Sequence, residues 1–146
     1  MEQVTEELLL MLTECNTLDE INVISLRNKQ YTTCLQVLAQ CPNLVIAYLQ
    51  NNRINLSDLS NLSYFKELRK LDLSNNNIKN LPEVETLSSL IRLKEFYLHS
   101  NQITSWQNLT DLTKMGSLIH LTLFKNPVAS TSGYRHYVVN SMPNLL

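Results

Sequence analysis

Glycine is scarce in this sequence, which holds only two glycines and four prolines among 146 residues. Loops that cradle phosphate need glycine, because a Cβ atom would keep the backbone N–H groups away from the anion. Neither G-x-G-x-x-G nor G-x-x-x-x-G-K-[ST] occurs along the chain. The sequence therefore argues against a nucleotide-binding enzyme, and we expect no cofactor and no small-molecule substrate.

Long hydrophobic runs are also missing. No apolar stretch approaches the roughly 20 residues that a membrane-spanning helix needs. Residues 1–7 lack the basic residues of a secretory signal, Leu8–Leu12 is too short for its apolar core, and Met1 is typical of an initiator methionine. We expect neither insertion into a membrane nor secretion.

Cysteine is present three times, as Cys15, Cys34 and Cys41, without a C-x-x-C pair. This odd number and spacing favour small core residues in a reducing compartment over a zinc or redox site. Three N-x-[S/T] triplets begin at Asn55, Asn61 and Asn108 and are expected to stay unmodified. The predicted location is cytoplasmic.

Net charge is −1, so no overall field attracts nucleic acid or a membrane surface. The charges are nevertheless unevenly distributed. Residues 1–20 hold six acids and no base, and the rest of the chain holds 12 bases and 7 acids. We interpret the acidic beginning as a solvated surface.

Leucine and asparagine are abundant, with 28 and 17 copies. They belong to a phrase of eleven positions that is apolar at positions 1, 4, 6 and 11. The phrase begins five times, at Ile21, Leu44, Leu68, Leu93 and Leu118, with spacings of 23 to 25 residues. This period is typical of leucine-rich repeats, in which one coil buries its leucines only by stacking on its neighbours.

The phrase also predicts the shape of each coil. Positions 4 and 6 alternate with outward positions, as in a short strand with one buried face. Asparagine at position 9 can bond the backbone of neighbouring turns, although the first copy has Lys29 there. Apolar residues then recur every third position, which favours 3₁₀ or short α segments: Leu56, Leu59, Leu62 and Phe65; Leu81, Val84, Leu87 and Leu90; Trp106, Leu109, Leu112 and Met115.

Caps are needed at both ends of such a stack. Thr5 is expected to cap a helix that turns Leu8, Leu12 and Cys15 inward. Residues 133–141 are expected to form a second helix that Pro143 ends, with Tyr134, Tyr137 and Val138 on its inner side. The sequence predicts an α/β solenoid with five parallel strands on its concave face and a single domain over 1–146, divided into a cap (1–20), five repeats (21–128) and a second cap (129–146).

The end of the chain resembles a known family. Asn126-Pro-Val128, the stretch Tyr134–Val139, and Met142-Pro-Asn-Leu145 are similar to the C-terminal cap of short intracellular leucine-rich repeat proteins. That class includes a regulatory subunit of protein phosphatase 1, a spliceosomal protein, acidic nuclear phosphoproteins and an axonemal dynein light chain. A Leu-Asp pair usually follows in those proteins, so we expect the cap to be truncated at Leu146. Gly133-Tyr-Arg-His136 with Val139-Asn-Ser141 resembles ciliary members, including leucine-rich repeat and IQ-motif proteins.

This resemblance implies protein binding without catalysis. The outward positions of the five predicted strands carry several apolar and aromatic residues, which often anchor partners. The predicted partner-binding residues on the concave face are Ile46, Tyr48, Lys70, Asp72, Glu95, Tyr97, His99, His120 and Phe124. We expect a ciliary or cytoskeletal scaffold; the alternative is a regulatory subunit of a phosphatase or of an RNA-processing particle that acts through protein contacts.

Three residues of the same predicted face could suggest enzymatic chemistry. Ser74, His99 and Asp72 fall close enough to suggest a nucleophile, a base and an orienting carboxylate. They lie on a flat face without a glycine elbow or oxyanion donors, so we expect no catalysis. His99 and His120 fall at opposite ends of neighbouring strands, too far apart to share a metal.

Direct nucleic-acid binding is not expected. The concave bases are Arg27, Lys70 and Lys125, and they are interleaved with Asp72 and Glu95. A groove that follows a phosphate backbone needs a denser and less interrupted row of positive charge. The expected partner is therefore a protein.

Overall fold

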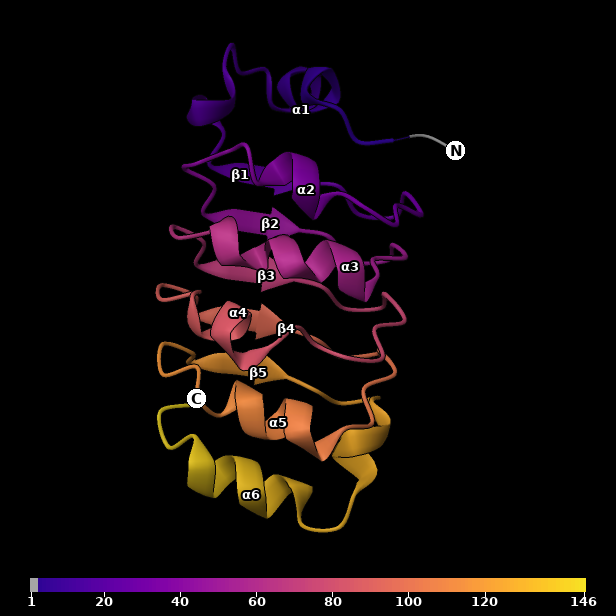
Figure 1. Ribbon diagram of the computed structural model, residues 1–146, viewed down its shortest axis with the longest axis vertical. Coiled ribbons are helices and arrows are strands. Elements are labelled where there is room, and N and C mark those ends of the chain that lie inside the picture. Colours follow the sequence, from indigo (N-terminus) through magenta and orange to yellow (C-terminus); the bar gives the residue numbers. More distant parts are fainter. Residues whose placement is uncertain (1–2) are drawn as a thin grey trace.

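Five coils stack into a solenoid in the computed structural model, which describes residues 3–146 (Figure 1). Met1 and Glu2, the first of the six N-terminal acids, lie outside the described residues. Each coil contributes one three-residue strand to a parallel sheet whose order follows the sequence. The strands are β1 (Val23–Ser25), β2 (Ile46–Tyr48), β3 (Lys70–Asp72), β4 (Glu95–Tyr97) and β5 (His120–Thr122).

The opposite side of each coil is a short helix, as the three-residue spacing predicted. These segments are η1 (Leu18–Glu20), α2 (Leu35–Leu38), α3 (Leu56–Leu59), η2 (Ser60–Tyr64), α4 (Val84–Ser88), α5 (Trp106–Leu112) and η3 (Pro127–Ser130). Most of the predicted convex apolar residues are buried. Leu56 and Trp106, the first residues of α3 and α5, are exceptions at 48% and 36% exposed.

One continuous core of leucine and other apolar side chains runs through all five coils. The middle residue of every strand except β5 is buried, and Phe96 in β4 is fully so. Each coil thereby shields the leucines of its neighbour, and the outward strand residues are left for the concave surface.

The asparagines at position 9 are buried and bonded to the backbone, as predicted. Asn101 accepts from the N–H groups of Asn76 and Ile78 through Oδ1 and donates from Nδ2 to the carbonyl of Leu73. Asn52, Asn76 and Asn126 make equivalent contacts. The first coil has Lys29 at this position. The second coil satisfies its backbone there, because Oδ1 of Asn52 accepts from the N–H of Lys29.

The two caps differ in how well the sequence predicted them. Thr5 caps α1 (Glu6–Thr13) by accepting from the N–H of Leu8. Leu8 and Cys15 pack against the core as expected, but Leu12 is 50% exposed and Leu9 is buried, so the prediction was wrong for Leu12. The helix packs with the side centred on Leu9 toward the first coil and ends at Glu14, whose backbone is left-handed.

At the other end, α6 (Tyr134–Ser141) begins after Gly133, which has a φ of 84°. Tyr134, Tyr137 and Val138 pack against the core, as expected. The structure confirms the predicted α/β solenoid with helical caps, whereas the division at residues 20 and 128 stays a prediction. Within the described residues, no helix is long and apolar enough to cross a membrane.

Candidate protein-binding site on the concave face

The strand register arranges the outward side chains in two straight rows across the sheet. Val23, Ile46, Lys70, Glu95 and His120 form one row of paired residues. Ser25, Tyr48, Asp72, Tyr97 and Thr122 form the other. Each row crosses five strands that are spaced about 4.8 Å apart, so residues far apart in the sequence lie side by side.

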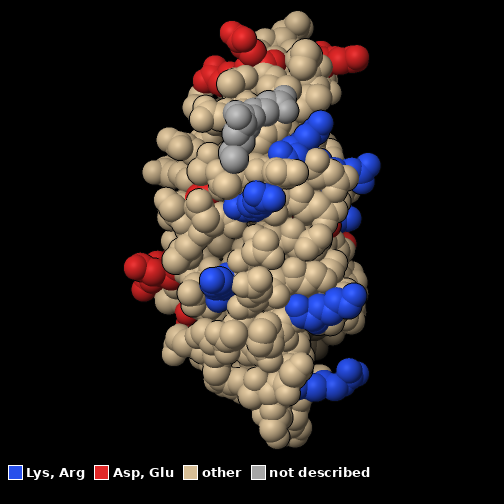
Figure 2. All heavy atoms as spheres, turned by 90° about the vertical axis from the view of Figure 1, so that its right-hand side faces the viewer, with Lys and Arg blue, Asp and Glu red and all other residues tan. Residues whose placement is uncertain are grey.

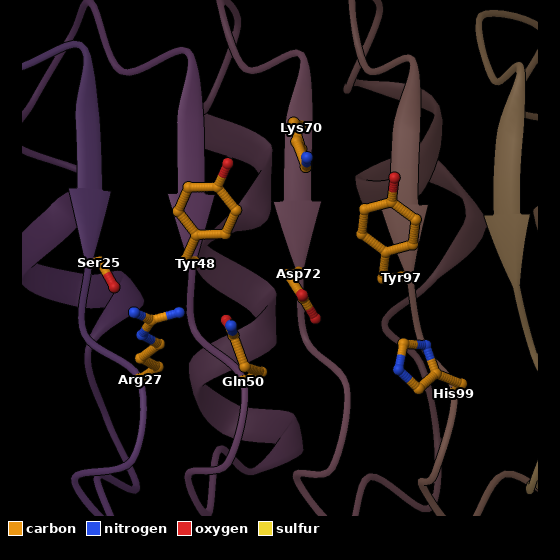
Figure 3. Close-up of a pocket in the computed structure, with 8 residues that line it drawn as sticks. All are labelled: Ser25, Arg27, Tyr48, Gln50, Lys70, Asp72, Tyr97 and His99. Carbon is orange, nitrogen blue, oxygen red and sulfur yellow. The ribbon is translucent and has the colours of Figure 1, made fainter.

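Lys70 lies between two tyrosine rings. Its Nζ atom is 5.3 Å from the ring centroid of Tyr48 on β2 and 5.5 Å from that of Tyr97 on β4. The three side chains come from three consecutive strands, and the rings flank the strand that carries the lysine (Figure 3). An ammonium group this close to aromatic faces is stabilised by their quadrupoles.

Glu95 completes this cluster. Its Oε1 atom accepts a hydrogen bond of 3.0 Å from the Tyr97 hydroxyl. Burial and this bond raise the pKa of Tyr97. Partial burial acts to lower the pKa of Lys70, but the negative charge of Glu95, with the two tyrosines, outweighs it and the net pKa is raised. At neutral pH the cluster therefore presents a charged Lys70 beside a protonated Tyr97.

A second aromatic group continues from Tyr97 toward the end of the stack. The His99 ring lies 6.5 Å from Tyr97, edge to face, and stacks on Phe124 at 4.4 Å with an interplanar angle of 12°. His99 Nδ1 is held at 2.7 Å from the hydroxyl of Thr122. Phe124 is 53% exposed, so this stack offers an apolar surface that a partner can cover.

An open hollow of about 480 Å³ lies on this face. Figure 3 shows its lining: Ser25, Arg27, Tyr48, Gln50, Lys70, Asp72, Tyr97 and His99. Within residues 3–146, the Oε1 atom of Gln50 is a buried oxygen without a hydrogen-bond partner. A buried acceptor of this kind costs free energy until a donor reaches it.

The three residues weighed for catalysis are arranged differently from a catalytic triad. Ser74 donates from Oγ to Oδ1 of Asp72 at 2.7 Å, and the same oxygen accepts from the Ser74 N–H. Ser74 is buried rather than outward-facing, because these two bonds hold it against its own strand. His99 bonds Thr122 instead of Ser74. The serine is thus joined to the carboxylate, and the histidine is engaged elsewhere.

The remaining predicted site residues lie in the first row. Ile46 pairs with Lys70, and His120 pairs with Glu95, so both border the cluster. His120 begins β5 whereas His99 follows the end of β4, so the two histidines lie at opposite ends of neighbouring strands, as expected. Across residues 3–146, no group of three or more His, Cys, Asp or Glu side chains is placed to hold a metal ion.

Sequence reasoning brought the nine predicted residues to one face. Ser25, Arg27 and Gln50 also line the hollow; the repeat register places them at outward positions of the first two coils, but they were not among the predicted binding residues. The repeat pattern could not show that the Lys70 ammonium group lies over the rings of Tyr48 and Tyr97. Whether these residues bind a partner stays a prediction.

Comparisons with known proteins agree with this architecture. The sequence profile of the leucine-rich repeat family matches residues 46–146. The mouse protein "Leucine-rich repeat and IQ domain-containing protein 3" is 41% identical over 108 residues, which cover 74% of this chain. The match spans only 17% of the mouse protein, which is therefore much longer than the chain.

Solved structures show the same fold. A leucine-rich repeat protein of Leptospira interrogans aligns over all of this chain and 34% of its own, with a TM-score of 0.78 and 23% identity. The Drosophila melanogaster SNF/U2A' complex contains a chain that aligns over 99% of this one and 82% of its own, with a TM-score of 0.77 and 23% identity. Leucine-rich repeat folds are typically non-catalytic interaction modules. The chain belongs to the leucine-rich repeat family.

Proposed function

We propose that this chain is a non-catalytic module that binds a segment of a protein partner on its concave face. The observation that carries the proposal is the aromatic surface formed by Tyr48, Tyr97 and Phe124, which three separate coils bring to one side of the sheet. Rigid aromatic side chains bury much area at little cost in conformational entropy, and they are enriched among binding hot spots.

The polar residues around the aromatics supply orientation. Lys70 and Arg27 offer donors, whereas Asp72 retains its Oδ2 atom as an acceptor in the hollow. A partner segment with both a donor and an acidic group matches this lining. Such groups fix the register of a bound segment more than they add affinity.

The proposed setting is the cytoplasm, with a ciliary or cytoskeletal scaffold as the role. Two observations support it: the resemblance of residues 133–141 to ciliary members of the class, and the 41% identity with a protein that combines leucine-rich repeats with an IQ domain. The second candidate is a regulatory subunit of a phosphatase or of an RNA-processing particle that acts through protein contacts. Its RNA-processing form is supported by the similarity to a chain of the SNF/U2A' complex.

Affinity capture with matched variants tests the concave site. The change Tyr97→Ala with Phe124→Ala should weaken partner binding by about 2 kcal/mol, or roughly thirtyfold in Kd. Lys114→Ala is the control, because Lys114 is exposed on the loop that leads into β5. Partner loss with the control, and retention with the double variant, would contradict the proposal. Recovery of axonemal or of spliceosomal proteins would distinguish the two settings.

A further inference from the structure

Positive charge gathers on the edge of the solenoid where the strands end. The loops that follow the strands are residues 26–34, 49–55, 73–82, 98–105 and 123–133, and none contains Asp or Glu. They carry five exposed bases, which we call the basic edge: Arg27, Lys29, Arg53, Lys79 and Lys125. Figure 2 faces this side, where basic side chains are spread along the stack and acidic ones gather at the N-terminal end and one margin.

The charges of the basic edge are not neutralised within the described chain. The only ion pair among residues 3–146 joins Arg92 to Glu67. Asp58, which follows the second loop, is buried and accepts from three backbone N–H groups. Glu83, at the start of α4, is the exposed acid that follows the third loop. The five bases therefore keep their capacity to bind an external anion.

The spacing of the basic edge suits an extended chain that crosses the coils. Neighbouring coils are about 4.8 Å apart, and four of the five carry a base there. The fourth coil has Gln102 instead, which donates to Asn77. A ladder of side-chain amides from Asn75 to Asn51 to Asn28 runs beside the bases and adds polar groups to the same surface.

We infer that the basic edge docks an acidic segment of a protein partner. The choice of a protein over a nucleic acid rests on the neighbouring side chains. Single-stranded nucleic acid needs aromatic platforms beside the positive charges. In the first four loops the exposed residues beside the bases are Asn, Gln and Thr, so Arg27, Lys29, Arg53 and Lys79 have no exposed aromatic platform within these loops. The exposed aromatic of the fifth loop, Phe124, is stacked on His99, and the aromatics of the concave face are accompanied by Asp72 and Glu95.

The basic edge adjoins the concave site but does not depend on it. Arg27 belongs to both, because its side chain lines the hollow together with those of Tyr48 and Lys70. A partner that fills the hollow can continue over this rim with acidic residues. The other four bases do not line the hollow, so binding at the basic edge can be tested separately from binding at Tyr97 and Phe124.

Fluorescence anisotropy with a labelled oligoglutamate peptide tests this inference on the full chain. We expect binding that weakens as salt is added, because exposed charges are screened beyond about 8 Å at physiological ionic strength. Arg53→Glu with Lys79→Glu should reduce the affinity about tenfold. Lys66→Glu with Lys114→Glu changes the net charge equally on exposed loops that lead into the strands, and should leave the affinity nearly unchanged.

Several results would overturn the inference. Equal losses in the two charge-reversal variants would mean that the peptide senses only net charge. Tighter binding of a labelled oligouridylate that is lost in Arg53→Glu with Lys79→Glu would assign the edge to RNA. Salt-sensitive self-association in sedimentation velocity, lost in that variant, would assign it to the acidic cap of a second copy. The variant Tyr97→Ala with Phe124→Ala should bind oligoglutamate normally, which separates this test from that of the concave site.

Discussion

Asp58 and Cys34 belong to neighbouring coils and are joined by a hydrogen bond of 2.9 Å from the Cys34 N–H to Oδ2 of Asp58. The same carboxylate accepts from the N–H groups of Leu35 and Gln36. These donors lie at the start of α2 and have no partner within that helix. The Asp58 side chain, which belongs to the second coil and is only 2% exposed, therefore caps α2 of the first coil.

Replacing Asp58 with alanine should destabilise the fold by about 2–4 kcal/mol, because three buried or partly buried donors lose a charged acceptor. Denaturant unfolding measures this free energy. Asp19→Ala is the matched control, since the Asp19 side chain is exposed, and it should change stability by less than about 0.5 kcal/mol. Equal midpoints for wild type and Asp58→Ala would mean that the cap contributes nothing.

Asn101→Ala should cost about 1–3 kcal/mol. The substitution leaves the N–H groups of Asn76 and Ile78, and the carbonyl of Leu73, without their side-chain partner in the middle of the stack. Urea melts of this variant can be compared with Gln102→Ala, which changes an exposed neighbour. Indistinguishable melts would contradict the structural role of asparagine at position 9.

The cysteines should differ in reactivity. Burial, with the nearby Asp58 carboxylate, raises the pKa of Cys34 well above its usual value, and burial with Glu6 raises that of Cys41. In the native protein Cys15, which is partly exposed, should react first with a thiol reagent. Fast labelling of Cys34 under native conditions, read by peptide mass mapping, would contradict its burial.

The same thiols predict a loss of stability at alkaline pH. Their folded-state pKa values are raised, so the unfolded chain releases these protons first. The stabilisation is fully present below about pH 9 and is lost as pH rises toward the folded pKa values. Thermal melts should show a shallower alkaline decline for Cys34→Ala than for the wild type; parallel curves would exclude this contribution.

Tyr97 should ionise above the usual tyrosine pKa, because it is partly buried and donates to Glu95. Glu95→Gln removes the negative acceptor and should lower the pKa of Tyr97 toward its ordinary value. Ultraviolet titration of tyrosinate measures the shift, and Tyr97→Phe identifies the contribution of this residue. An unchanged titration in Glu95→Gln would show that burial alone sets the pKa.

Periodicity explains which features could be predicted from the sequence. Strand rows such as Lys70 beside Glu95 depend only on repeat length, and so does the burial of Asn76 and Asn101. The Asp58 cap was not predictable in this way. The Asp58 carboxylate and the N–H groups that donate to it lie about one repeat apart in the sequence, and no shared motif links them. Lys70 between its tyrosines and Ser74 turned toward Asp72 depend on side-chain conformations, which a repeat pattern does not specify.

The asparagine contacts that cross from one coil to another all point the same way along the stack. Asn52, Asn76, Asn101 and Asn126 each bond the backbone of the coil before them. Each coil therefore depends on its successor, and the solenoid has a polarity that its leucine core lacks. Loss of the last coil would leave a backbone N–H group of the fourth coil without its side-chain acceptor. Loss of the fourth coil would then do the same to the third. Unfolding that starts at the C-terminal end should consequently propagate toward the N-terminus, whereas fraying at the first coil leaves the side-chain acceptors of the second free to bond water.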